Sequence, residues 1–142
     1  SQTLAFAEVY TALNNKTVDG QENTFNNIDT QNYQDVQKYL TVSKHGRLDY
    51  VVLTNTTFWN GLSPENKKII EEAMKEATAY ATKLADEENQ KSFEKLKNSG
   101  KMEFYYLTEE DRQKFIAALE PVYQAYTEKI GKEYIDAARA SK

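Results

Sequence analysis

The sequence predicts an α/β protein that is rich in helix and contains one unusually long helix. The run Tyr50–Leu53 is apolar without interruption, which is typical of a strand buried on both faces of a sheet between helices. Ser63-Pro64-Glu65 carries the signals of a helix start, and we expect that helix to run to about Asn98. A chain of 142 residues is long enough for one domain with a real core.

Shorter helices and strands surround the long helix. Phe6, Val9 and Leu13 recur at the three- and four-residue spacings of an amphipathic helix. After them the chain reverses sharply at Asp19-Gly20. We expect a short strand at Thr17–Glu22, a helix at Ile28–Lys38, and strands at Tyr39–Val42, Leu48–Asn55 and Met102–Leu107.

The long helix has clear signals at both ends. In Ser63-Pro64-Glu65 the Ser caps free backbone N–H groups, the Pro suits the first helical position and the Glu complements the helix dipole. Ser99-Gly100 supplies the stop. Only Phe93 and Leu96 are large and apolar near the end, so we expect that end to be the more exposed part. The main apolar stripe consists of Ile69, Ile70, Ala73, Met74, Ala77, Tyr80, Ala81, Leu84 and Ala85.

The chain beyond residue 107 is expected to form further helices. Thr108 caps the first of them, and Asp111 stands where a capping box requires a carboxylate. Because a proline removes one helical hydrogen bond and clashes with the previous turn, we expect one helix to end near Leu119 and another to begin at Pro121. Gly131 is a weak point in the last helix.

Composition excludes several classes of function. Lys and Arg number 18 against 22 Asp and Glu, and no basic stripe is present, so nucleic-acid binding has no electrostatic footprint. The longest apolar run is far too short to span a bilayer. The chain has no Cys and one His, which excludes thiol catalysis, disulfides and Cys- or His-rich metal sites.

The stretch Phe6–Asn23 carries a family resemblance. It combines a short helix with the string Val18-Asp19-Gly20-Gln21-Glu22-Asn23, and little in this order is needed merely to fold. It resembles the substrate-binding subunit of tripartite ATP-independent periplasmic (TRAP) transporters, the DctP family. The resemblance continues through Val36–Thr41, His45 and Phe58–Glu65. Thr24 departs from the family, which usually has Pro after the Asn.

The resemblance implies an architecture. Residues 1–142 match the C-terminal half of a two-lobed periplasmic binding protein, as a single fragment that contributes elements of both lobes. The long helix would brace the two lobes. The N-terminal half, with the family's Arg that clamps the substrate carboxylate, is expected to lie upstream of Ser1.

The resemblance also implies site residues, each with a structural alternative. Asn23 would hydrogen-bond the ligand, and its alternative is a turn residue after Asp-Gly. Phe6 would form an apolar wall, or else pin the first helix to the core. Asp49 would favour a polyol, an amine or a cation, and its alternative is a solvated acid at a strand edge. No catalytic residue, metal site or cofactor is expected, since His45 lacks a nucleophile signature beside it.

The function implied is capture of a small organic acid in the periplasm and its delivery to TRAP permease subunits, from a precursor with a signal peptide. The isolated fragment is expected to bind poorly. The alternative is a helical interaction module without a transport role, which forms a homodimer through exposed truncated surfaces. Neither nucleic acid nor direct membrane insertion is expected, and an enzyme is a distant third possibility.

Overall fold

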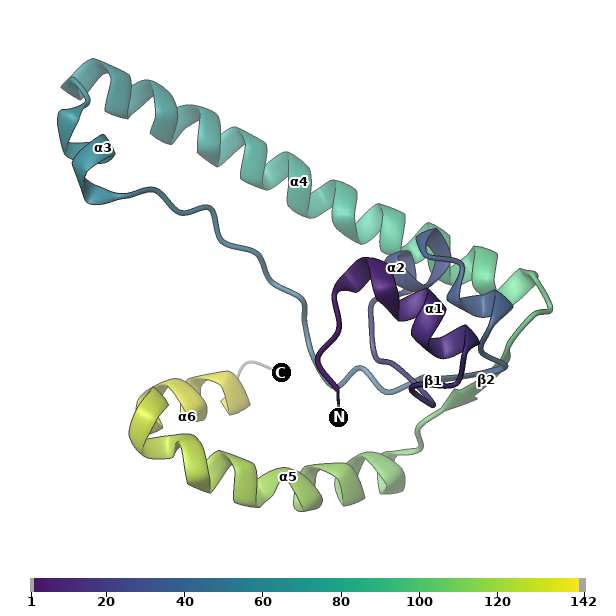
Figure 1. Cartoon of the computed structure of the whole chain (residues 1–142). Helices are drawn as coiled ribbons and strands as arrows, with labels where there is room; N and C mark the ends of the chain where they lie inside the picture. Colours follow the sequence, from purple (N-terminus) through teal and green to yellow (C-terminus); the bar gives the residue numbers. More distant parts are fainter. Residues whose placement is uncertain (1, 141–142) are drawn as a thin grey trace. The chain divides into compact units, whose positions relative to one another are not determined.

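The computed structural model describes residues 2–140 (Figure 1). Helices dominate it, and the strands form one two-stranded sheet in the described part of the chain. In chain order the elements are the 3₁₀ helix η1 (Phe6–Glu8), α1 (Val9–Asn14), α2 (Phe25–Thr30), the 3₁₀ helix η2 (Tyr33–Asp35), β1 (Tyr39–Val42), α3 (Thr56–Gly61), α4 (Pro64–Asn98), β2 (Glu103–Tyr106), α5 (Glu109–Ile130) and α6 (Lys132–Ala140).

The described residues form two compact units. The first comprises the chain up to Leu40 together with Lys44–Phe104, and the second comprises Thr41–Ser43 and the chain from Tyr105 onward. The core lies in the first unit. Its buried apolar side chains are Ala12, Leu13, Ile28, Tyr33, Leu40, Leu96 and Met102.

In this core, α2 packs on the last turns of α4. Phe25 of α2 lies 4.9 Å from the Phe93 ring of α4, centroid to centroid, and Leu96 is only 1% exposed. The expectation that this end of the helix is the more exposed part was therefore wrong. Ile69 and Tyr80, in the earlier stripe, are 56% and 68% exposed. The apolar stripe forms one face of α4, but α2 covers only the C-terminal turns of that helix, so most of the stripe remains exposed.

The ends of α4 follow the sequence signals. The Ser63 side chain accepts a hydrogen bond from the Asn66 backbone N–H (3.2 Å), and Pro64 occupies the first helical position. The helix ends at Asn98 and is followed by Gly100 with φ +68°, a conformation that glycine adopts without steric cost. Both predicted boundaries are confirmed.

The predicted helix Ile28–Lys38 is split in the structure. It begins earlier, as α2, because the Thr24 hydroxyl accepts from the Asn27 backbone N–H and caps it. It is interrupted at Asn32, whose φ of +56° is left-handed, a conformation that Asn tolerates better than most residues. The 3₁₀ turn η2 follows, and burial raises the pKa of its Tyr33 hydroxyl.

The sheet pairs β1 with β2, which confirms two of the predicted strands. The Glu103 backbone N–H donates to the carbonyl of Lys38 (2.8 Å), and the two side chains form an ion pair of 3.0 Å. The two strands therefore start side by side and run in parallel. A parallel pair needs a crossover connection, which here contains α4.

The strands predicted at Thr17–Glu22 and Leu48–Asn55 do not form. Tyr50–Leu53, expected to be buried, is 77% to 85% exposed. A strand needs a neighbour for its backbone N–H and C=O groups, and no described strand lies against this segment. The apolar run shows that this segment could be buried, but its local sequence does not specify the neighbouring strand that burial would require.

The second unit contains α5 and α6. Thr108 and Asp111 form the predicted capping box. The break expected at Pro121 is wrong, because α5 continues through it. The proline removes one helical hydrogen bond and crowds the previous turn, but the residues before it, Ala117–Glu120, are strong helix formers and the helix stays continuous. The helix ends instead at Gly131, where φ is +97°.

Candidate functional site

The loop Asp19–Asn23 connects α1 to α2 and is held by the side chain of Gln37, which lies between η2 and β1. The Gln21 amide donates to Gln37 Oε1 (3.3 Å), and Gln37 Nε2 donates back to the carbonyl of Asp19 (3.5 Å). Gly20 lies next to the same amide: a Cβ built on Gly20 would be 3.9 Å from Gln37 Nε2. The sharp turn is thus fastened to a residue distant in sequence, and Gln37 itself carried no special signal.

Asn23 lies at the end of this loop and is half-buried. Its Oδ1 accepts a hydrogen bond from the Thr24 backbone N–H (3.2 Å) and a second one from the Asn27 side-chain amide. The Thr24 hydroxyl accepts in turn from the Asn27 backbone N–H (3.3 Å). Asn23, Thr24 and Asn27 therefore form one small network, which we call the Asn23 network.

Phe6 begins η1 and is 49% exposed, whereas Leu13 of the same amphipathic stretch is 5% exposed. Leu13 and its neighbour Ala12, which is 8% exposed, thus anchor this stretch in the core. Half of the Phe6 side-chain surface remains available for contact with another molecule.

Asp49 lies on the extended segment that leads to α3. Its carboxylate is 3.4 Å from the Arg47 guanidinium, and both side chains are largely exposed. The same segment is tied to the loop by His45, whose Nε2 lies 3.2 Å from the Glu22 carboxylate. His45 and Glu22 entered the sequence analysis as parts of the family resemblance, and their pairing was not predicted because no local spacing connects them.

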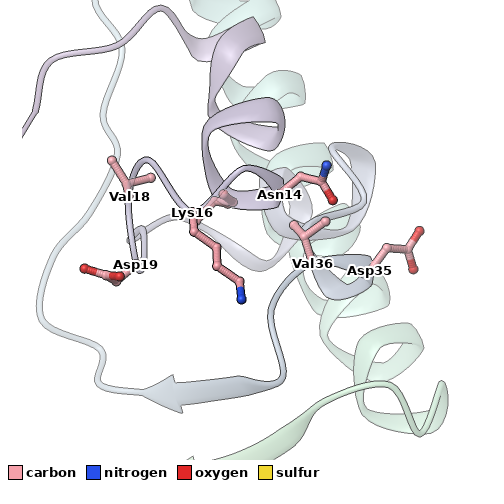
Figure 2. Close-up of a pocket in the computed structure, with 7 residues that line it drawn as sticks. Asn14, Lys16, Val18, Asp19, Asp35 and Val36 are labelled. Carbon is pink, nitrogen blue, oxygen red and sulfur yellow. The ribbon is translucent and has the colours of Figure 1, made fainter.

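The structure thus brings the His45 segment beside the immediate neighbour of Asn23. No hydrogen bond or ion pair links Phe6, Asn23 and Asp49 to one another within residues 2–140. A surface hollow of about 330 Å³ is lined by residues that include Lys16, Asp19 and Val36. Figure 2 shows the side chain of Lys16 between those of Asp19 and Val36. None of the three predicted residues lines this hollow, nor a second hollow of about 280 Å³ formed by residues of the second unit.

The side chains around the Asp19–Asn23 loop can offer hydrogen bonds and charge interactions to a ligand. Over residues 2–140, no group of three His, Cys, Asp or Glu side chains is arranged to hold a metal ion. In the same range no helix combines the length and apolarity needed to cross a membrane.

Comparison with known proteins gives consistent matches. Residues 1–129 match the family model DctP, described as bacterial extracellular solute-binding protein, family 7. The C4-dicarboxylate-binding periplasmic protein DctP of Rhodobacter capsulatus is 44% identical over 140 residues, which are 99% of this chain and 42% of that protein. The C4-dicarboxylate-binding protein DctB of Bacillus subtilis is 37% identical over 92% of this chain and 37% of its own length.

Solved structures agree with this. A TRAP periplasmic solute-binding protein from Shewanella oneidensis with bound succinate is 35% identical with a TM-score of 0.88, over 94% of this chain and 44% of that one. One from Pseudomonas aeruginosa with bound L-malate is 32% identical with a TM-score of 0.81, over 88% and 44%. The chain therefore spans less than half the length of the proteins it resembles.

These matches confirm the predicted fold class, a helix-rich α/β part of a periplasmic solute-binding protein with one long helix. The family consists of solute-binding proteins and not of enzymes. The chain belongs to the bacterial extracellular solute-binding proteins of family 7, the DctP family, which the residues Phe6–Glu65 had already indicated.

Proposed function

We propose that this chain serves as the extracytoplasmic solute-binding component of a TRAP transporter, in the periplasm. It captures a small organic acid and delivers it to the membrane permease subunits. The observation that carries this proposal is the nature of the ligands in the similar structures. Both succinate and L-malate are four-carbon dicarboxylates, so we propose the same class here.

Three residues are proposed to contact the ligand. Asn23 supplies hydrogen bonds to a carboxylate, and the half-exposed ring of Phe6 supplies an apolar wall to the carbon skeleton. Asp49 lies on the segment that His45 ties to the loop, and its carboxylate suits a hydroxyl substituent on the carbon skeleton of the acid, an amine or a cation, and not the acid groups themselves. The mechanism is capture without chemistry, so no catalytic residue or cofactor takes part.

The 142 residues are proposed to contribute elements of both lobes of a two-lobed protein and to bind only weakly in isolation. A charge-assisted hydrogen bond contributes about 1.5–3 kcal/mol. Without an arginine clamp, the affinity for a carboxylate is therefore expected to fall by about tenfold or more. Enclosure of the ligand from a single side weakens binding further.

A chimera tests this proposal. The chain replaces the matching part of the Rhodobacter capsulatus relative, and succinate binding is measured by calorimetry for the chimera and for the isolated chain. We expect micromolar binding by the chimera and weaker binding by the chain. A folded chimera that binds no four-carbon dicarboxylate overturns the proposed function, and micromolar binding by the isolated chain overturns the proposed weakness.

A second candidate function is self-association as a helical interaction module. It is favoured by the exposure of Tyr50–Leu53, which presents an apolar extended segment to solvent. Light scattering over a range of concentrations decides: a monomer throughout counts against a homodimer.

A further inference from the structure

We propose that Thr24 and Asn27 are positioning residues that hold the Asn23 amide in a single orientation, with its oxygen turned into the protein and its NH₂ group left for the ligand. Asn23 then recognises the ligand only as a hydrogen-bond donor. This inference rests on the proposed function, since it assigns the role of hydrogen-bond donor to Asn23, a residue that the proposed function places against the ligand.

The Thr24 backbone N–H fixes which atom of the Asn23 side chain lies against it. This group can donate a hydrogen bond but cannot accept one. The Asn23 side-chain atom that faces it at 3.2 Å must therefore be the oxygen. A flipped amide would place two donors against each other, so the backbone itself excludes the flip.

Both lone pairs of the Asn23 side-chain oxygen are occupied within the protein. An amide oxygen accepts two hydrogen bonds, one for each lone pair. The Thr24 N–H takes one place and the Asn27 side-chain amide takes the other. Asn23 Oδ1 therefore has no lone pair left for a ligand.

Asn27 is itself held in place by the first turn of α2. Its backbone N–H donates to the Thr24 hydroxyl, which fixes it in the first turn of α2. The helix is in turn fastened to α4, because the Asn26 backbone N–H donates to Asn89 Oδ1 (3.1 Å) and Asp29 is paired with Lys95 (2.7 Å). The two donors that orient Asn23, from Thr24 and Asn27, are thus held in place by the packing of α2 on α4.

The free group is Asn23 Nδ2. No residue in the described part of the chain accepts a hydrogen bond from it, and the side chain is only half-buried. Its two N–H bonds suit the lone pairs of a carboxylate or carbonyl oxygen. An ammonium or amide N–H of a ligand at the same place would meet only donors. The Asn23 network therefore selects an acceptor group.

The orientation is tested without ligand, by side-chain amide NMR of the full 142-residue chain. We expect the Asn27 NH₂ protons to exchange with water several-fold more slowly than those of Asn23. Thr24→Pro retains the φ of −69° that Thr24 already has but removes both the N–H that faces Asn23 and the hydroxyl that caps Asn27, and we expect it to alter the Asn23 and Asn27 side-chain amide shifts. Protection of the Asn23 protons in place of those of Asn27 overturns the inference.

The polarity is tested by titration with succinate, followed through chemical shifts so that weak binding remains measurable. Loss of the donor in Asn23→Ala should weaken binding about tenfold. Asn23→Asp should weaken it further, because a carboxylate then faces the ligand's carboxylate. Asn32→Asp, an exposed site with the same chemical change, is the control and should leave binding unchanged.

The two arms separate this inference from the proposed function. If Asn23→Asp binds succinate as tightly as Asn23→Ala or more tightly, the donor role is overturned. If the wild-type chain, and also the chimera, binds no dicarboxylate, the proposed function fails, while the exchange pattern still decides the orientation of Asn23. Circular dichroism confirms that each variant is folded.

Discussion

The Lys95 ammonium lies 2.7 Å from one oxygen of the Asp29 carboxylate and 3.0 Å from the other. This pair joins α2, which follows the Asn23 loop, to the end of α4. The Asp29 side chain is 8% exposed and that of Lys95 is 70% exposed. The carboxylate therefore depends on the protein for its partners, whereas the ammonium is also solvated by water.

This asymmetry predicts that Lys95→Met destabilises the fold more than Asp29→Asn. In Lys95→Met the buried carboxylate keeps only a 3.4 Å hydrogen bond from the Ser92 hydroxyl, and we expect a loss of about 1–3 kcal/mol. Asp29→Asn retains an acceptor and should cost less than about 1 kcal/mol. Urea denaturation measures both. Lys83→Met, which removes a surface pair of 3.8 Å, is the control, and the reverse order of the first two variants would contradict the argument.

The capping box of α5 predicts an acid-sensitive step. Hydrogen bonds from the hydroxyls of Thr108 and Tyr105 lower the pKa of Asp111 below its ordinary value of 3.8. A carboxyl whose pKa is lower in the folded state stabilises the fold above its unfolded pKa, and this contribution disappears as the pH falls through the folded value. Helix content below about pH 4 should therefore fall in a step that Asp111→Asn lacks.

Far-ultraviolet circular dichroism from neutral to acid pH measures that step. The matched control is Glu110→Gln, which changes the neighbouring carboxylate of the same first turn but leaves the capping box intact. It should keep the step. Identical acid profiles for wild type and Asp111→Asn would show that the capping box does not control this transition.

The continuous helix at Pro121 predicts that Pro121→Ala stabilises α5. Alanine restores the hydrogen bond to the carbonyl four residues earlier, and the gain in helix stability is up to about 3 kcal/mol. Hydrogen exchange should show slower opening around residue 121. A variant with faster exchange there would mean that the proline supports a conformation other than an unbroken helix.

The exposed segment Tyr50–Leu53 predicts self-association of the isolated chain at high concentration. Val52→Lys replaces a side chain that is 78% exposed by a charge. Because burial of one valine contributes about 1.5 kcal/mol, the association midpoint should move about tenfold higher in concentration. Thr54→Lys is the control for charge. Sedimentation equilibrium that shows no shift for Val52→Lys would place any association elsewhere on the chain.

The features that could be predicted from the sequence are those set by neighbours in the chain. Ser63 with Pro64, and Thr108 with Asp111, satisfy backbone groups within one helical turn, so their patterns identify both helix starts. Burial depends on distant segments and was predicted less well. Leu96 is buried because α2 lies over it, and Tyr50–Leu53 is exposed because no described strand pairs with it.

In the candidate site, too, the local features could be predicted from the sequence and the contacts between distant residues could not. Asn23 and Phe6 were proposed as site residues from the resemblance of a contiguous string, and the family match supports that resemblance. Gln37, which fastens the turn, and the Glu22–His45 pair were missed because each joins residues far apart in sequence. Asn27 lies four residues from Asn23, a helical spacing that could have suggested their contact.

The length of α4 has a mechanical consequence. Its buried residues, Ser92 and Leu96, both lie near the end that α2 covers, while 35 residues give the helix a length of roughly 50 Å. The helix is therefore held near its C-terminal end, beside α2, and that point serves as the fulcrum of a lever whose long arm reaches Pro64. A tilt of about 5° at the fulcrum displaces the opposite tip, at Pro64, by roughly 4 Å, so a slight adjustment near the fulcrum is magnified at the far tip.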